Sequence, residues 1–172
     1  MRQTSSQSIL TAHHEAGHAV AAYFLGRAFT RVSIEANEET VGRCSFRAPG
    51  EWFRPHERLD TRTRARLEER IIISLAGPHA EAMFSGRFDD DAAAEDIARA
   101  SELADYMSNN DPDESQAYLE WLGYRTRRLT EREVFWPAVD ALAHGLLGAG
   151  EIPYRRARLI IEAAQVLSTS NA

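Results

Sequence analysis

The segment His14-Glu15-Ala16-Gly17-His18 limits the folding of this chain more than any other part of its sequence. On a helix, residues i and i+4 lie on the same face, so both imidazoles can approach a single ion. Two neutral nitrogens held by one rigid turn suit Zn²⁺. Apolar residues that follow, such as Val20 and Phe24, would bury most of this helix, and a buried imidazole pair requires a partner such as a cation. The motif therefore predicts a zinc site inside a helical protein.

Glu15 is the candidate catalytic residue. It lies about 100° around the helix from His14, close enough to reach a water on the metal without binding the metal itself. We expect Glu15 to act as a general base and then to protonate the leaving amine of a cleaved peptide bond. Gly17 leaves room for another element to pack closely.

The third ligand must come from elsewhere, because a catalytic zinc has three protein ligands and one open position. The extended pattern H-E-x-x-H-x-x-G-x-x-H is absent, since positions 21 and 24 are Ala and Phe. A glutamate about twenty residues downstream would be Glu38 or Glu39, but these lie in a predicted turn rather than on a helix.

Asp96 is the better candidate for the third ligand. It shares the apolar stripe of its predicted helix, and a carboxylate on such a stripe has to be paired or bind a metal. Asp91 and Glu95 are its competitors. The alternative for Asp96 is an ordinary acidic residue near a helix N-terminus, where the helix dipole favours it.

The remaining pattern predicts a mainly α fold with a small β-hairpin. Alternation predicts strands at 31–35 and 42–47 with a turn at 36–41, and the second strand could present its edge to an extended peptide or be covered by the following loop.

Gly77-Pro78 predicts a kink or break. Capping boxes are predicted at 111–114 and 130–133. Arginines between 62 and 70 predict a solvated helix face. The expected helices span about 8–25, 61–84, 92–107, 112 onward, 130–148 and 153–167.

Composition excludes several functions. All 20 basic residues are arginine, so the chain has no lysine for a P-loop or a Schiff base. The net charge of −6 argues against a nucleic-acid partner. We expect no signal peptide and no membrane span. The lone Cys44 cannot form an internal disulfide, so we expect a cytoplasmic protein.

Several segments together resemble the zinc peptidase domain of the FtsH-type, ATP-dependent membrane proteases. His14–Val20 is similar to that family's HEAGHA signature, and 32–34 resembles the strand after the zinc helix. Residues 75–81 are similar to its Gly-Gly-Arg-Ala-Ala-Glu segment, with Pro78 in place of the usual Arg. Residues 96–101 are similar to its Asp-Leu-x-x-Ala-Thr segment. The likeness covers about 10–108 and continues more weakly, in helical pattern, to about 165.

This resemblance implies that His14, His18 and Asp96 bind Zn²⁺ and that Glu15 is the catalytic base. Glu81 matches a family glutamate and would orient a ligand histidine, although a glutamate on the helix surface fits equally well. The implied fold is a helical zincin-like peptidase domain with a small β-hairpin and a C-terminal helical bundle. We expect a single domain over 1–172, with a zinc-site core at about 8–108 and a C-terminal helical part at about 111–168.

The resulting hypothesis is a zinc metalloendopeptidase that acts on peptides or unfolded proteins. The family's ATPase module and membrane anchor are not expected in this chain, so its substrates would be short peptides, unfolded segments or proteins that a separate factor delivers. A homo-oligomer is a further expected partner. A catalytically inactive, zinc-stabilised binding or assembly module is the alternative, and a helical interaction domain without metal is a third hypothesis. An intact Glu15 favours the enzyme, because a structural site has no use for that base.

Overall fold

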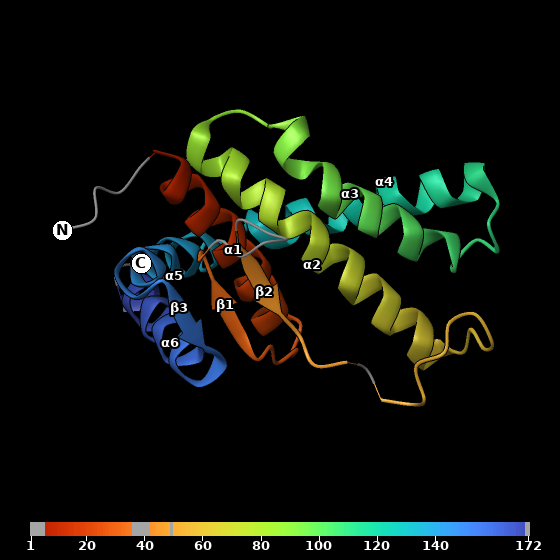
Figure 1. Ribbon diagram of the computed structural model, residues 1–172, viewed down its shortest axis with the longest axis horizontal. Helices are drawn as coiled ribbons and strands as arrows, with labels where there is room; N and C mark the ends of the chain where they lie inside the picture. The colour runs from red at the N-terminus through yellow and green to blue at the C-terminus, as the bar shows by residue number, and fades with distance from the viewer. Residues whose placement is uncertain (1–5, 36–41, 49, 171–172) are drawn as a thin grey trace.

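A computed structural model describes residues 6–35, 42–48 and 50–170 of the chain. Within these residues, helices dominate and a small antiparallel sheet accompanies them, which confirms the predicted mainly α fold (Figure 1). The helices are α1 (Ser6–Phe24), α2 (Thr61–Ser85), α3 (Asp90–Asp105), α4 (Pro112–Thr130), α5 (Phe135–Ala149) and α6 (Tyr154–Ser170).

The sheet contains the predicted hairpin and one strand that the sequence pattern did not predict. β1 (Arg31–Ser33) and β2 (Arg43–Ser45) pair antiparallel, with Val32 opposite Cys44. β3 (Glu151–Pro153) pairs with the other side of β1 and places Ile152 opposite Val32. The order β2-β1-β3 leaves β2 at an edge. The turn predicted at 36–41 lies outside the described residues.

Side-chain caps fix the starts of three helices. Asp60 accepts a hydrogen bond from the Thr63 backbone N–H at the start of α2, and Asp111 does the same for Glu114 at α4. Asp89 caps α3. Gly26, with φ of 69°, follows α1 in the left-handed conformation expected of a residue after a helix C-terminus.

The second predicted capping box, at 130–133, is wrong. Thr130 is the last residue of α4, and its hydroxyl donates back to the Arg127 carbonyl at 3.0 Å. α5 begins only at Phe135, and its N-cap Val134 forms no side-chain cap. Pro137 therefore lies in the first turn of α5, where the missing N–H costs nothing.

α2 is one continuous helix through Pro78, so of the kink or break predicted at Gly77-Pro78 the break does not occur. α1 packs against this part of α2, where Gly77 and Ala80 lie next to Gly17. This interhelical contact packs α2 on both sides of the proline, which cannot donate a backbone hydrogen bond.

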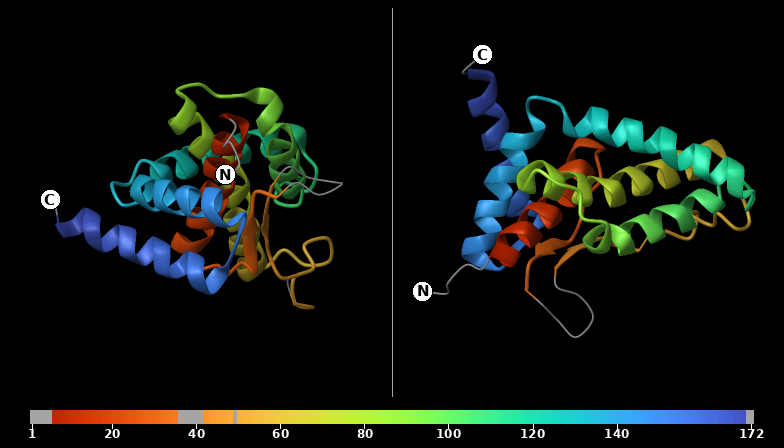
Figure 2. Two further views of the ribbon diagram at one scale, coloured as in Figure 1. Left: turned by 60° about the vertical axis from the view of Figure 1, so that its left-hand side comes forward. Right: turned by 90° about the horizontal axis from the view of Figure 1, so that it is seen from above.

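Two apolar clusters hold the helices together. The first joins α1 to α5, α6 and the sheet, with Val20, Phe135, Leu142 and Ile152 fully buried. The second joins α2 to α3 and α4 through residues such as Leu67. Figure 2 shows α2, α3 and α4 side by side on one side of the molecule and the α5–α6 pair on the other. α1 lies between the two groups and belongs to the interior.

None of the helices in the described ranges is long and apolar enough to cross a membrane. The proposed division into a zinc-site core and a C-terminal helical part stays a prediction.

The close crossing of α1 and α2 depends on Gly17. A Cβ atom at this position would lie 2.6 Å from the Ala80 Cβ and 2.7 Å from the Ala76 carbonyl oxygen. Neither neighbour can rotate away, because one is a backbone atom and the other is attached to the backbone. Residue 17 therefore sets how closely the two helices approach.

We predict that Gly17→Ala lowers the free energy of unfolding by about 1–3 kcal/mol, the usual cost of overpacking a core. Gly123→Ala is the matched control, because Gly123 lies within α4 and a Cβ there would meet nothing within 4 Å. The control should gain up to about 1 kcal/mol from helix propensity. Urea unfolding measures both, and a Gly17→Ala protein as stable as wild type would contradict this account of the crossing.

Candidate metal centre

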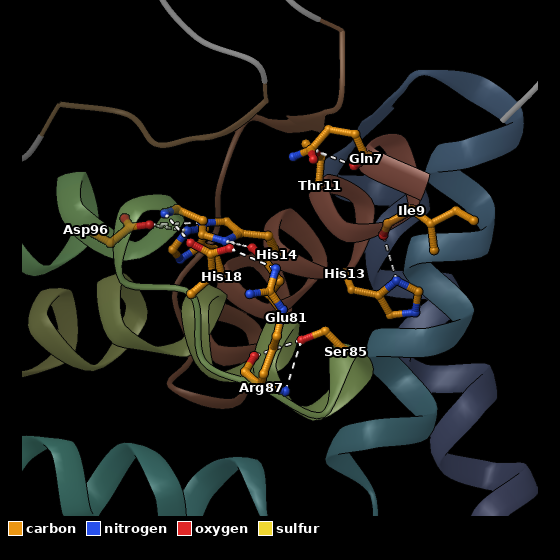
Figure 3. Close-up of polar contacts among 12 residues, drawn as sticks. Gln7, Ile9, Thr11, His13, His14, His18, Glu81, Ser85, Arg87 and Asp96 are labelled. Carbon is orange, nitrogen blue, oxygen red and sulfur yellow. Dashed lines mark hydrogen bonds and ion pairs between the residues drawn. The ribbon is translucent and has the colours of Figure 1, made fainter. Parts of the chain in front are cut away.

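Three side chains from two helices converge at the crossing of α1 and α2. His14 and His18 project from α1, and Asp96 reaches them from α3 (Figure 3). The Nε2 atom of His14 lies 2.9 Å from the Asp96 Oδ2, and the Nε2 of His18 lies 3.3 Å from the same oxygen. One ligand atom from each residue falls within 4.8 Å of the others. The sequence predicted this trio, and the fold brings it together.

The outer nitrogen of each histidine has a fixed partner. The Nδ1–H of His18 donates to the Ile73 carbonyl at 2.7 Å, and Nδ1 of His14 lies 2.9 Å from the Glu81 Oε2. A carbonyl oxygen and a carboxylate oxygen accept hydrogen bonds and do not donate them. Both Nδ1 atoms therefore carry the hydrogen. With its hydrogen on Nδ1, each ring presents Nε2 to the Asp96 carboxylate, where that nitrogen can either hold a proton or bind a metal ion as a neutral imidazole.

This donor set fits a zinc ion. Two nitrogen lone pairs and a carboxylate oxygen repel one another unless a cation lies between them. Ligand atoms around a tetrahedral zinc are separated by about 3.4 Å, close to the two distances to Asp96. Two histidines and one carboxylate leave a fourth position for water or substrate, as catalytic zinc sites require.

Protons compete with a metal ion for the nitrogen and oxygen atoms of this centre. Burial lowers the pKa of His14, but its hydrogen bonds with Asp96 and Glu81 outweigh that effect and raise the pKa to about 10. Burial likewise acts to raise the pKa of Asp96, but the charge of His18 and the hydrogen bonds from both histidines hold it well below its usual range. The centre therefore attracts positive charge strongly.

Glu15 lies beside this trio and is buried. Burial raises the pKa of its carboxyl, while the charges of His18 and His14 lower it. Its Oε2 has no hydrogen-bond partner among the described residues. Gly42, at the start of β2, lies so close that a Cβ there would be 2.9 Å from the Glu15 Oε1. Glu15 therefore has an uncommitted oxygen where sequence reasoning expected a general base.

Glu81 and Gly77 position the two histidines from α2. The contact of Glu81 with His14 is the orienting role that the resemblance suggested. From the sequence, Gly77 was predicted only to contribute to a kink or break, yet a Cβ at that position would overlap the His18 imidazole. The signal was present, because Gly77 belongs to the segment at 75–81 that carries the resemblance. The Ile73 carbonyl has no side-chain signature and was unpredictable.

The competing candidates lie elsewhere. Asp91 and Glu95 are exposed, and Glu95 pairs with Arg99 at 2.6 Å. Glu38 and Glu39 lie outside the described residues. His13 points away from the trio in Figure 3, and its Nδ1 bonds the Ile9 carbonyl. Its ring stacks on Phe84 with centroids 3.9 Å apart, which makes it a packing residue.

Comparison with known proteins agrees with this geometry. The family model described as "Peptidase family M41" matches residues 1–110, a span that includes both histidines, Glu15, Glu81 and Asp96. No curated protein sequence matches the chain significantly.

We predict that the purified protein binds about one equivalent of Zn²⁺ and that Asp96→Asn weakens this binding more than the roughly 10–100-fold typical of losing an outer hydrogen-bond partner. Asp91→Asn makes the same chemical change on an exposed residue of the same helix and should leave the affinity unchanged. Competition with a chromogenic chelator measures both affinities. Equal affinities for the two variants would exclude Asp96 as a ligand.

Glu81→Gln tests the orienting contact. The amide cannot accept the hydrogen of His14 Nδ1 as strongly as the carboxylate does, so zinc affinity should fall by roughly 10–100-fold while the fold persists. The same chelator competition measures the affinity, and circular dichroism checks the helix content. An unchanged affinity would show that the 2.9 Å contact does not support the centre.

Proposed function

Because this chain belongs to peptidase family M41, we propose that it is a zinc-dependent metalloendopeptidase that hydrolyses peptide bonds. His14, His18 and Asp96 would hold the ion, and Glu15 would act as the catalytic base. The observation that carries the proposal is the buried Glu15 carboxylate, with one oxygen unpartnered, next to a three-ligand set that leaves a fourth position open. When bound, zinc supplies a Lewis acid that polarises the peptide carbonyl and acidifies the attacking water.

Glu15 moves the protons in this reaction. Its carboxylate takes a proton from the attacking water and passes it to the amine of the departing product. Burial raises the pKa of Glu15, which makes its carboxylate a stronger base for the first of these steps. Glu81 and the Ile73 carbonyl keep the two imidazoles in the tautomer and orientation that ligation requires.

The edge strand β2 offers a place for an extended peptide. β1 occupies one side of β2, and the order of the sheet leaves the other side at the edge. A peptide that added to this edge as a further strand would pass Glu15, because Gly42 at the start of β2 touches that side chain. Peptides and unfolded segments are the substrates that such pairing favours.

The alternative is an inactive, zinc-stabilised binding or assembly module. The same ligands would then serve stability, and the carboxylate of Glu15 would be an unexplained buried charge. Structural zinc sites bind four protein ligands, whereas the described residues supply three. A cytoplasmic location, a homo-oligomer and a separate factor that delivers substrate stay predictions.

We predict that the zinc-loaded protein cleaves unfolded casein or a quenched fluorescent peptide, and that Glu15→Gln lowers the rate by roughly 10²–10⁴-fold, the usual contribution of a general base. Glu95→Gln is a control of the same chemistry at an exposed position. Metal analysis should find equal zinc in all three proteins. Zinc binding without cleavage by the wild-type protein would favour the binding module.

A further inference from the structure

Arg70 of α2 lacks the carboxylate partner that Arg66 and Arg125 have. The sequence pattern predicted a solvated arginine face here, but Arg70 is half-buried. Arg66 pairs with Glu69 at 3.5 Å, and Arg125 pairs with Glu68 at 3.3 Å. Across the part of the chain that the structure describes, no carboxylate lies within ion-pair distance of Arg70. Its guanidinium instead lies 5.5 Å from the centre of the Phe53 ring.

Two other arginines act on the guanidinium of Arg70. Burial lowers the pKa of Arg70, and the charges of Arg66 and Arg99 lower it further, whereas the exposed Glu102 raises it. A guanidinium stays charged even under such conditions. Arg66 and Arg99 already pair with Glu69 and Glu95, so Arg70 is the cation of this group that an added anion would stabilise.

Arg70 lies on the face of α2 that supports the candidate metal centre. Positions 70, 74, 77 and 81 follow the four-three-four spacing of one helix stripe. Gly77 touches the His18 imidazole, and Glu81 bonds His14. Arg70 is seven residues before Gly77, which is about 10 Å along the helix axis.

α3 brings a second arginine to the same side of the centre. Arg99 follows Asp96 by three residues, and its Nη1 lies 3.9 Å from the Asp96 Oδ1. Its Nη2 contacts Glu95 at 2.6 Å, so Arg99 is partly neutralised whereas Arg70 is not. Arg70 is therefore the one of these three arginines that has no carboxylate partner among the described residues.

We propose that Arg70, flanked by Arg99, binds a carboxylate of the peptide substrate, so that the enzyme prefers substrates with an acidic group a few residues from the cleaved bond. This inference rests on the proposed peptidase function. An extended peptide advances about 3.3 Å per residue, so the separation of about 10 Å corresponds to about three residues. The carboxylate would come from an internal Asp or Glu side chain or from the C-terminus of the peptide.

The test measures peptide binding separately from cleavage. The zinc-loaded Glu15→Gln protein is titrated with fluorescent, amidated peptides in which one Glu moves along an otherwise neutral sequence. Neutral peptides in which Gln replaces this Glu, either amidated or with a free C-terminus, complete the set. We expect one Glu position, or the free C-terminus, to bind roughly tenfold more tightly than the neutral amidated peptide, as suits a charge-assisted hydrogen bond.

Arg70→Gln, added to this protein, should reduce the preference to less than about twofold, while the neutral peptide binds as before. Arg158→Gln is the matched control, because it removes the same charge from an arginine on α6 that pairs with Glu162. Arg99→Gln, at an exposed position, tests the same region if the half-buried Arg70 cannot be replaced without unfolding. It should weaken the preference in part.

Three results would overturn the inference: no preference for any carboxylate, an undiminished preference in Arg70→Gln, or an equal loss in Arg158→Gln. These results are distinguishable from failure of the proposed function. If the wild-type protein, which retains Glu15, cleaves neutral and acidic peptides equally well, the proposed carboxylate site is wrong and the peptidase function stands. If that protein cleaves nothing while the binding preference is lost only on substitution of Arg70, the carboxylate site stands and the peptidase function is wrong.

Discussion

The close contact between α1 and α2 is the constraint on which the rest of the structure depends. Two glycines, one on each helix, let the backbones approach within the distance that a side chain would otherwise fill. At that distance the Ile73 carbonyl can accept the hydrogen of His18, and Glu81 can reach His14. The helix that carries the histidines and the helix that orients them therefore form one rigid unit, and the chemistry of the centre is set by backbone packing.

Asp96 joins this unit through a different set of contacts. α3 packs on α2 through the second apolar cluster, where Ala100 and Leu103 lie against Leu67 and Ile71. The position of the carboxylate therefore depends on an apolar interface about one turn farther along α3, and not on the histidines themselves. The two imidazoles and the carboxylate lose hydration where they meet, and the apolar contacts of α3 supply free energy that offsets this cost.

The sequence was most informative where one local rule decides the structure. The spacing of His14 and His18, the cap at Asp111 and the apolar stripe that includes Asp96 each predicted their element, because helix periodicity and capping act within a few residues. It failed where distant contacts decide. β3 is only three residues long and forms because β1 is beside it. Thr130 begins a sequence that matches a capping box, but its hydroxyl donates a hydrogen bond within α4 instead. Arg70 also lacks a carboxylate partner because nearby acidic side chains form ion pairs with other arginines.

β1 has a consequence for how the molecule is made. Its two partners come from opposite ends of the chain, and the bond between Ser33 and Gly150 spans 117 positions. Contacts of such length close late, because the chain entropy of a long loop must be overcome before the contact contributes any stability. During synthesis the histidine helix, the hairpin and Asp96 all leave the ribosome before β3 exists. One side of the central strand therefore stays unpaired until β3 has been translated, so the sheet beside the histidine helix is completed by a segment that follows the whole candidate metal centre.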